Sequence, residues 1–363
     1  MKLPIFTIAL GMWMGTAVAE EEGFAPMFNG RDLSGWVNVN CSPETWAVRD
    51  GMIACTGHPT GALRTERQYE NFIMEVEWRH LKNAGNAGIF LWASPIAAPA
   101  VPFLRAIEVQ VLDHGYGNTD SYTTHGDVFP IHGATMKPFG RHNGMRSFPS
   151  ESRSKPSPEW NHYRIECNAG VLRLSVNGKE VSGGEEGQWR KGYIGLESEG
   201  SPVEWRNLRI KELPASGATA EQTAPEAQGH RPLYNGADLR GWNCKTPDRW
   251  KPSDWQLVLS KGPATEPLWT DAEVGDCEVI LDCLPGETPP TVLVRGTDAT
   301  TTLPLAGTPG KWGRFTITIK GGECTVQLGS ETKRIPLEGT SPKHALGLGG
   351  AGATFANIYA RPR

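Results

Sequence analysis

The amino-acid sequence predicts an all-β protein built from two tandem jelly-roll β-sandwiches, the second of them shortened. Short segments throughout the chain alternate apolar and polar residues with a period of two, which is the pattern of half-buried strands. Glycine and proline are abundant, at 43 and 28 of 363 residues, and both favour turns. A nine-residue motif near the N-terminus also returns in the second half of the chain. Many short strands joined by tight turns, in two related blocks, are typical of tandem sandwiches.

The strand pattern is clearest in two segments of the first half. Over residues 72–79 and 107–112, apolar residues occupy every second position, and polar or charged residues occupy most positions between them. Asp50-Gly51 and Asn177-Gly178 are dipeptides typical of two-residue hairpin turns. No segment combines helical periodicity with capping residues over about 12 positions. We therefore expect strands and turns rather than helices.

The internal repeat is unequal in length. Phe28–Trp36 and Tyr234–Trp242 agree at six of nine positions, and Trp160–Ile165 resembles Trp312–Ile317. The first pair of motifs lies 206 residues apart, but the second pair lies only 152 apart. The second copy is therefore 54 residues shorter between these points, where the first copy carries most of its unusual polar residues. We expect the chemistry in the first copy.

These signals divide the chain into four parts. We expect a signal peptide over residues 1–19, a complete sandwich over 20–213 and a shortened, degenerate sandwich over 230–363. Residues 214–229 are rich in Ala, Thr, Glu, Gln and Pro and have no periodicity, which is typical of a linker.

The N-terminus has the composition of a secretory signal. Lys2 precedes an apolar run, and Ala17-Val18-Ala19 forms a small-x-small cleavage site. A membrane anchor is the alternative, but the run is short, and no other stretch approaches the roughly 20 apolar residues that a span requires. We expect a mature chain that has no membrane span and is periplasmic or secreted.

Charge and cysteine content narrow the range of partners. The formal net charge is −4, so the chain has no basic excess to neutralise phosphates, and nucleic acid is not an expected partner. The seven cysteines cannot all pair within one chain. Cys277 and Cys283 share the apolar face of one predicted strand, so we interpret them as buried thiols.

The densest group of polar residues lies between residues 107 and 132. Glu108 and Gln110 project from one face of a strand whose other face is apolar, which predicts a polar, open face of the sandwich. The alternative is an ordinary solvated face. Glu77 and Arg79 likewise occupy alternate positions on one face of a second strand. Two such strands, together with 13 tryptophans, indicate a sugar-binding cleft, so carbohydrate is the expected partner.

Further candidates follow these strands along the chain. His125, Asp127 and His132 combine imidazole and carboxylate at short spacing, which suits a divalent metal ion, although a loop histidine is more often solvated. Glu199 lies on a late strand and could face the same cleft. Gly85–Gly88 lacks the strand–helix setting of a phosphate loop, and no G-x-S-x-G element is present.

Several motifs occur together and in order over about residues 24–213. They include Phe28–Trp36, Trp46–Gly51, Glu77–Arg79, Gly85–Ile89, Glu108–Asp113, Trp160-Asn161, Asn177-Gly178 and Ile194–Asn207. In these motifs the sequence resembles the 3-keto-disaccharide hydrolase-like domain family. The resemblance implies the concanavalin A-like lectin/glucanase sandwich. The second copy resembles this domain only at its opening and in its late strands.

The resemblance also implies action on glycosides whose sugar is oxidised at C3. A 3-keto group acidifies the C2 proton, so a base can remove it and the C1 substituent can leave, after which water adds to the enone. We assign catalytic roles to Glu108, Asp113 and His125, with Glu108 or His125 as the base, and a metal-binding or acid role to Asp127 and His132. The expected substrate-binding residues are Glu77, Arg79, Asn86, Gln110, Glu199 and Arg206.

Two other functions remain open on the same fold. A laminarinase-type glycosidase would carry Glu-x-Asp-x-x-Glu on one strand, whereas this chain has Glu108, Gln110 and Asp113 in that spacing. A non-catalytic carbohydrate-binding protein is the third possibility, because a fold does not determine a function.

Overall fold

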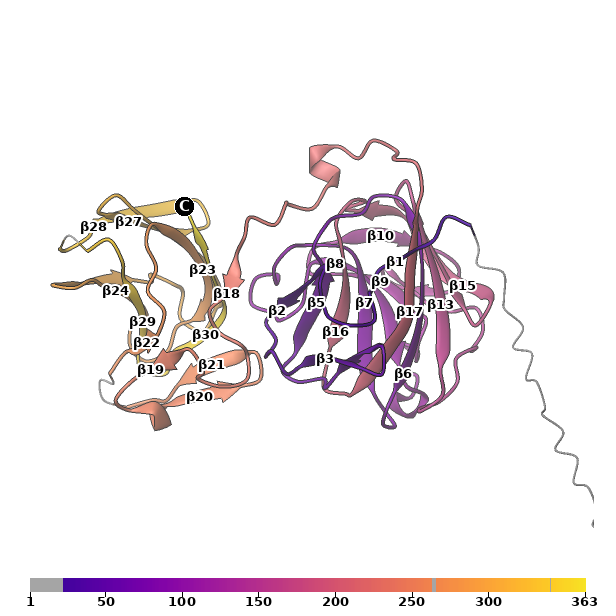
Figure 1. Cartoon of the computed structure of the whole chain (residues 1–363), viewed down its shortest axis with the longest axis horizontal. Coiled ribbons are helices and arrows are strands. Elements are labelled where there is room, and N and C mark those ends of the chain that lie inside the picture. The colour runs from indigo at the N-terminus through magenta and orange to yellow at the C-terminus, as the bar shows by residue number, and fades with distance from the viewer. Residues whose placement is uncertain (1–21, 263–265, 340) are drawn as a thin grey trace, which may run out of the picture.

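The computed structural model describes residues 22–262, 266–339 and 341–363, and it confirms the all-β prediction (Figure 1). Within these residues the helices are three 3-10 turns, η1 (His114–Tyr116), η2 (Ala220–Gln222) and η3 (Pro247–Arg249). None of the helices in the described ranges is long and apolar enough to cross a membrane. The predicted signal peptide over residues 1–19 lies outside them.

The first domain consists of two antiparallel sheets, which we call sheet 1 and sheet 2. In sheet order, sheet 1 contains β10 (Thr135–Pro138), β15 (Lys179–Gln188), β14 (Val171–Val176), β13 (Asn161–Asn168), β6 (Phe72–His80), β17 (Val203–Glu212), β4 (Met52–Cys55) and β3 (Trp46–Arg49), with β1 (Ala25–Pro26) paired to β17. Sheet 2 contains β11 (His142–Asn143), β12 (Arg146–Ser147), β9 (Val128–Ile131), β8 (Ala106–Leu112), β7 (Asn86–Ala93), β16 (Tyr193–Ser198), β5 (Gly61–Thr65) and β2 (Trp36–Val39).

The core of the first domain lies between sheets 1 and 2, and the period-two pattern decides which side chains enter it. Met74 and Trp78 of β6 pack in one cluster with Val109 and Val111 of β8, and all four side chains are buried. Residues between them on each strand point to the opposite face of their own sheet. Glu108 and Gln110 therefore lie on the face of sheet 2 that is turned away from the core, as the alternation predicts.

The second domain also has two sheets, sheet 3 and sheet 4. In sheet order, sheet 3 contains β20 (Trp250–Ser253), β21 (Gln256–Leu259), β30 (Thr354–Pro362), β23 (Cys277–Leu284), β26 (Gly313–Lys320), β27 (Glu323–Leu328) and β28 (Glu331–Pro336), with β18 (Arg231–Pro232) paired to β30. Sheet 4 contains β19 (Trp242–Asn243), β22 (Leu268–Thr270), β29 (Ala345–Gly349), β24 (Thr291–Arg295) and β25 (Thr300–Pro304).

The two domains follow the same strand order. Sheet 3 runs as sheet 1 does from β3 to β15, and sheet 4 runs as sheet 2 does from β2 to β8. In this correspondence the strands β9 to β12 of the first domain have no partner among the described strands of the second. These strands span residues 128–147, within the stretch where the sequence motifs indicate that the second half is shorter.

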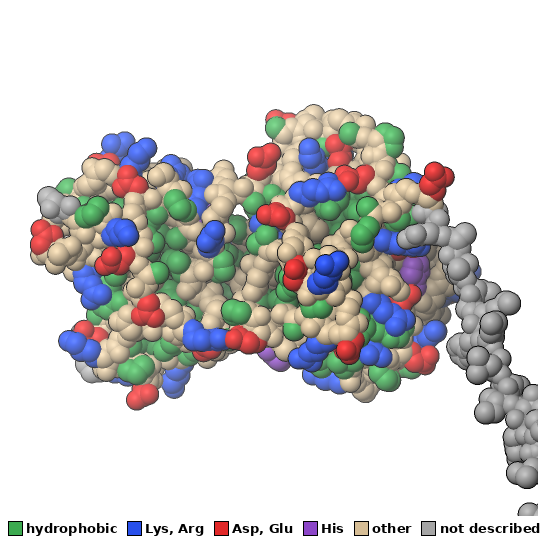
Figure 2. Space-filling view, in the orientation of Figure 1, with side chains coloured by type: hydrophobic (Ala, Val, Ile, Leu, Met, Phe, Trp, Pro, Cys, Tyr) green, Lys and Arg blue, Asp and Glu red, His purple; other side chains and the backbone are tan. Residues whose placement is uncertain are grey.

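The second domain packs on the outer face of sheet 2. The space-filling view shows the two domains in contact (Figure 2). Tyr359 of β30 is buried in a cluster with Val39, Phe90 and Tyr193 of the first domain, and Ile280 of β23 packs against the same cluster. The Tyr359 hydroxyl group donates a hydrogen bond of 2.7 Å across the interface to Asn40 Oδ1. One side of the polar face of sheet 2 is therefore covered by the second domain.

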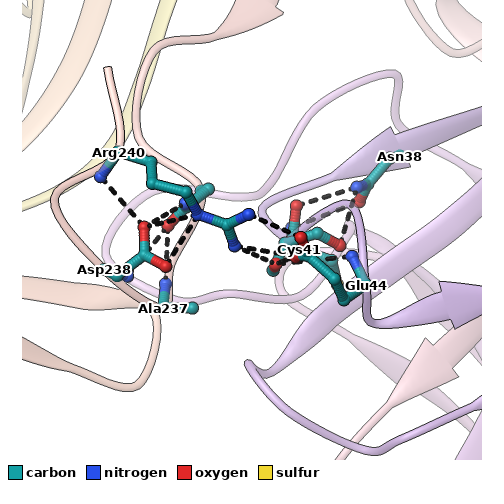
Figure 3. A network of polar contacts seen from close by, with 8 residues as sticks. Asn38, Cys41, Glu44, Ala237, Asp238 and Arg240 are labelled. Carbon is teal, nitrogen blue, oxygen red and sulfur yellow. Dashed lines mark hydrogen bonds and ion pairs between the residues drawn. The ribbon is translucent and has the colours of Figure 1, made fainter. Parts of the chain in front are cut away.

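Polar contacts reinforce this interface. The Arg240 guanidinium lies between Asp238 of its own domain and Glu44 of the first domain (Figure 3), with 2.7 Å from Nη2 to Glu44 Oε2. Asp254 accepts hydrogen bonds of 2.7 Å from the backbone N–H and the hydroxyl group of Thr60. Since Arg240 and Glu44 are exposed, we expect their ion pair to contribute little to stability.

The connecting segment over residues 214–229 lies along the first domain rather than away from it (Figure 1). The Ala224 N–H donates to the Lys191 carbonyl at 2.8 Å, and the Ala227 N–H donates to the Tyr193 hydroxyl at 2.7 Å. These contacts hold the segment across one end of sheet 2.

All seven cysteines are free thiols in the structure. Cys277 and Cys283 are buried in the core of the second domain, which agrees with their interpretation as thiols on the apolar face of one strand.

Candidate active site

A pocket of about 210 Å³ opens on the outer face of sheet 2. Strands β7, β8, β9 and β12 line it, together with the end of β16 and the loops beside them. Its lining residues are Asn86, Phe103, Glu108, Gln110, Phe129, Ile131, His132, Arg146, Glu197 and Glu199.

Three carboxyl groups meet in this pocket. Glu108 comes from β8, Glu197 from β16, and Glu199 directly follows β16. Gly88 of β7 makes room for them, because a Cβ atom there would lie 2.8 Å from Glu108 Oε1 and 2.9 Å from Glu197 Oε2. These two oxygens are therefore at most about 5.7 Å apart, the sum of those two distances.

Burial and mutual repulsion change the acidity of all three groups. Burial, with the neighbouring Glu199 charge, raises the pKa of Glu108 to about 8. Burial raises the pKa of Glu199 to about 7, and burial with the charges of both neighbours raises the pKa of Glu197 well above its ordinary value. Three such acids do not all ionise together, so at neutral pH Glu108 and Glu197 keep their protons while Glu199 is partly ionised.

The three groups differ in their hydrogen bonding. Glu197 is only 1% exposed, and its Oε2 has no hydrogen-bond partner. Its carboxyl group hydrogen bonds to Glu199, an arrangement that needs a proton on one of the two. Since the pKa of Glu197 is the one raised well above its ordinary range, we place that proton on Glu197.

Two amides and a guanidinium group orient the carboxylates. The Asn86 amide donates to Glu199, and Gln110 Nε2 donates to Asn86 Oδ1 at 3.0 Å. Arg146 Nη1 donates in turn to Gln110 Oε1 at 3.4 Å. The guanidinium also lies over the Phe129 ring, 3.3 Å from its centroid. The pocket thus has a protonated side and a cationic side.

Asp127 supports Arg146 from beneath the pocket. Its carboxylate is fully buried, pairs with Arg146 Nη1 at 3.0 Å and accepts the Thr123 N–H at 2.9 Å. Burial raises the pKa of Asp127, while the bonds from Thr123 and Arg146 oppose that rise. Asp127 therefore positions Arg146 rather than lining the pocket.

Five residues selected from the sequence come together here: Asn86, Glu108, Gln110, His132 and Glu199. His132 stacks on Phe103 with ring centroids 5.7 Å apart and an angle of 7°. Burial lowers the pKa of His132, so we expect a neutral imidazole at the rim.

Asp113 and His125 do not line the pocket. This corrects the expectation that they lie beside Glu108 in the catalytic site. The Asp113 carboxylate accepts the backbone N–H groups of Ala84 and Gly115, each at 2.9 Å, and these bonds hold its pKa below the ordinary value although burial opposes them. His125 stacks on His114 at 4.5 Å, and burial lowers its pKa to about 4. Both residues lie beyond the far end of β8 and hold the loop that follows it.

Glu77, Arg79 and Arg206 lie on the other side of the sandwich, which corrects the expectation of one shared cleft. They belong to β6 and β17 of sheet 1 and point away from its core face. Arg206 pairs with Glu77 at 2.6 Å. The guanidinium groups of Arg79 and Arg206 both stack on the Trp160 ring. The period-two pattern shows which faces of a strand differ, but not to which sheet the strand belongs.

The predicted metal ligands do not fit a metal site. Asp127 is engaged by Arg146 and Thr123, and His132 packs on Phe103. Within the described ranges, no group of three or more His, Cys, Asp or Glu side chains is arranged to hold an ion. We therefore assign no step to a metal.

Glu197 and Arg146 were not among the residues selected from the sequence. Glu197 had a usable signal, because it lies two positions before Glu199 and so shares its face. Arg146 had none, since β12 is only two residues long and its side chain reaches the pocket through the path of the loop.

Comparisons with known proteins agree with the family resemblance. Residues 23–211 match the model of the 3-keto-alpha-glucoside-1,2-lyase-like domain. A 3-keto-disaccharide hydrolase of Bacteroides thetaiotaomicron is 22% identical over 250 residues, which cover 53% of this chain and 80% of that protein.

Solved structures of similar proteins cover about half of the chain. A candidate glycosyl hydrolase of Parabacteroides distasonis is 22% identical, with a TM-score of 0.43 over 53% of this chain and 95% of that one. A carbohydrate-binding module of Bacillus subtilis is 13% identical, with a TM-score of 0.35 over 49% of this chain and 96% of that one.

Proposed function

The chain belongs to the 3-keto-alpha-glucoside-1,2-lyase-like domain family, and on this premise we propose that its first domain cleaves glycosides whose sugar is oxidised at C3. The observation that carries the proposal is the group of Glu108, Glu197 and Glu199 beside Arg146 in one pocket. Two of these carboxyl groups have pKa values raised to about 8 and about 7, the range in which acid–base catalysis at neutral pH is most effective.

The proposed reaction begins with proton removal. A ketone at C3 acidifies the proton on C2, and a carboxylate takes that proton while the electron pair forms the C1=C2 bond. The C1–O bond breaks, and a protonated carboxyl group transfers its proton to the leaving oxygen. Water then adds across C1=C2 of the enone, which returns a proton to C2 and completes the hydrolysis.

The order of the pKa values of Glu108 and Glu199 assigns the roles of general base and general acid. Glu199 has the lower pKa of the two, so it ionises first and acts as the base, while Glu108 keeps its proton to higher pH and acts as the acid. From the sequence we expected Glu108 or His125 as the base and Glu199 as a substrate-binding residue. Arg146 is placed to stabilise the negative charge that develops on the C3 oxygen during proton removal.

Leaving-group chemistry separates the two assignments. Loss of the acid in Glu108→Gln should be largely relieved when the leaving group is 4-nitrophenolate, which needs no proton to depart. Loss of the base in Glu199→Gln should be equally severe for every leaving group. The opposite pattern would exchange the two roles.

A pair of substrates tests the function itself. The purified protein should cleave a 3-keto-disaccharide and leave the same unoxidised disaccharide intact. Cleavage of the unoxidised sugar would instead indicate a laminarinase-type glycosidase, and binding without turnover a carbohydrate-binding protein. Addition of EDTA tests the metal, and we expect activity to be retained because Asp127 and His132 are engaged by other side chains.

Two further parts of the proposal concern the rest of the chain. Residues 1–19 have the pattern of a signal peptide, so mature protein from the periplasm or medium should begin at Glu20. The second domain is proposed to be a shortened copy of the first, and its sheet 4 strands contain no Asp or Glu. Catalysis is therefore assigned to the first domain alone.

A further inference from the structure

A second pocket, of about 350 Å³, lies where the two domains and their connecting segment meet. Its lining consists of residues 94–99, Arg105, His132 and Trp189 of the first domain, Pro225, Glu226 and Gln228 of the connecting segment, and His230, Glu278, Ile280 and Arg314 of the second domain. His132 lines both this junction pocket and the carboxylate pocket, so the two open side by side. A ligand that fills the carboxylate pocket and extends past His132 would enter the junction pocket.

The lining of the junction pocket is mainly apolar. Ile96, the neighbouring Ala and Pro residues and Ile280 form much of it. A second sugar ring would set many of its hydroxyl groups against this apolar part of the lining, and unpaired polar groups are costly to bury. A flat, apolar ring has no hydroxyl groups to bury without a partner, and it gains apolar contact with the walls.

His230 and Arg314 also line the pocket, but they pair with Glu278 and Asp282 at 3.2 and 2.7 Å. Arg105 differs from them. Its guanidinium lies over the Trp189 ring, 3.5 Å from the centroid, and its Nη1 is buried without a hydrogen-bond partner. Buried N–H groups of native proteins almost always have a partner. A carboxylate or phenolic oxygen on a ligand in the pocket would supply this partner.

We propose that the junction pocket binds the aglycone of the substrate, and that this aglycone is an aromatic ring bearing an acidic or phenolic oxygen for Arg105. This inference rests on the proposed function, because it places the oxidised sugar in the carboxylate pocket. It also gives the second domain a role, since Ile280 closes one wall of a site that the first domain leaves open.

Three 3-keto-glucosides of the same anomer test the proposal: the methyl, the phenyl and the 4-carboxyphenyl glycoside. Ile280→Trp should fill the pocket and lower kcat/KM for both aromatic substrates by about tenfold or more, while the methyl substrate changes less than about twofold. Arg105→Met should lower kcat/KM by about tenfold for the 4-carboxyphenyl substrate alone. For each substrate, kcat/KM of the variant is divided by kcat/KM of the wild type. This ratio cancels the intrinsic difference in reactivity between the leaving groups.

Thr325→Trp is the matched control. Thr325 lies in β27, two strands from β23 in sheet 3, and does not line the pocket. This variant should leave all three substrates unchanged. Ile96→Trp fills the same pocket from the first domain, so it repeats the test if Ile280→Trp disturbs the packing of the second domain, which thermal unfolding would reveal.

The outcomes separate the two proposals. If the wild type cleaves neither a 3-keto-disaccharide nor any of the three 3-keto-glucosides, the proposed function fails, and the aglycone assignment fails with it. If it cleaves the 3-keto-disaccharide but none of the three glucosides, only the aglycone assignment is overturned. If the wild type cleaves them but both tryptophan variants affect the methyl and aromatic substrates equally, or affect none, only the aglycone assignment is overturned. Selective loss of the aromatic substrates supports it.

Discussion

Sheet 2 of the first domain and sheet 4 of the second share a strand order but differ in what their strands carry. β8 and β16 of sheet 2 supply Glu108 and Glu197, whereas the strands of sheet 4 contain no Asp or Glu. Sheet 2 also continues into β9, β12 and β11, which have no counterpart among the described strands of sheet 4.

The additional strands build one wall of the pocket. Phe129 and Ile131 come from β9, His132 follows it, and Arg146 comes from β12. The two scaffolds thus differ in a few strand positions and one added segment, and these positions and this segment form the carboxylate pocket of the first domain. Five predictions test this comparison.

The largest effect is expected from Glu108→Gln. The amide has nearly the same shape but cannot donate an acidic proton, so kcat/KM for a 3-keto-disaccharide should fall by roughly 10²–10⁴. Glu77→Gln is the matched control, because Glu77 lies on sheet 1 away from the pocket and should retain activity. Steady-state kinetics measures kcat/KM for both variants. Equal losses of kcat/KM would contradict the assignment of the active site to sheet 2.

The second prediction concerns the added segment. Arg146→Met leaves Asp127 buried and unpaired, so we expect the free energy of unfolding to fall by about 3 kcal/mol and activity to be lost. The double variant Arg146→Met/Asp127→Asn removes the uncompensated charge and should recover much of the stability but not the activity. Urea unfolding and kinetics report the two quantities, and recovery of activity in the double variant would argue against a catalytic contribution from Arg146.

Gly88→Ala should have a smaller effect. The new Cβ would lie under 3.0 Å from oxygens of both Glu108 and Glu197, so the two carboxyl groups must move apart. We expect kcat/KM to fall by about tenfold and the free energy of unfolding by roughly 1–3 kcal/mol. Gly178→Ala is a poor control because its φ is positive, whereas Gly275→Ala has its nearest neighbour at 3.5 Å and should be nearly neutral in activity. An unchanged rate in Gly88→Ala would show that the spacing of the carboxyl groups does not matter.

The smallest effects concern pH. With Glu199 ionised and Glu108 protonated in the active form, kcat/KM should peak between about pH 7 and 8 and fall on both sides. The Glu108→Gln variant should lose the descending limb in its residual activity. A profile that rises steadily above pH 8 would contradict the assignment of Glu108 as the acid.

Stability should also depend on these groups. The pKa of Glu108 is raised in the folded protein from 4.5 to about 8, so the folded state binds this proton more tightly than the unfolded chain. The stabilisation is complete below about pH 4.5 and is lost as the pH rises towards 8. Glu108→Gln should flatten this part of the curve of unfolding free energy against pH, as measured by urea titration.

The sequence by itself determined the all-β class and the core faces of the strands. Alternation is a local property, because side chains on a strand point to opposite faces in turn, and so Val109 and Glu108 could be placed on opposite sides without knowledge of their neighbours. The family motifs likewise brought Asn86, Glu108, Gln110 and Glu199 together as candidates.

Only the tertiary structure decided which strands face the same pocket. Glu77 and Glu108 have the same local pattern, yet they lie on sheets 1 and 2, because pairing between strands distant in sequence sets the sheet to which each belongs. Arg146 reaches the pocket from a two-residue strand through a loop that no local pattern describes. The raised pKa values are also tertiary, since they arise from burial and from the approach of three carboxyl groups from two strands that are separated in the sequence by more than 80 residues.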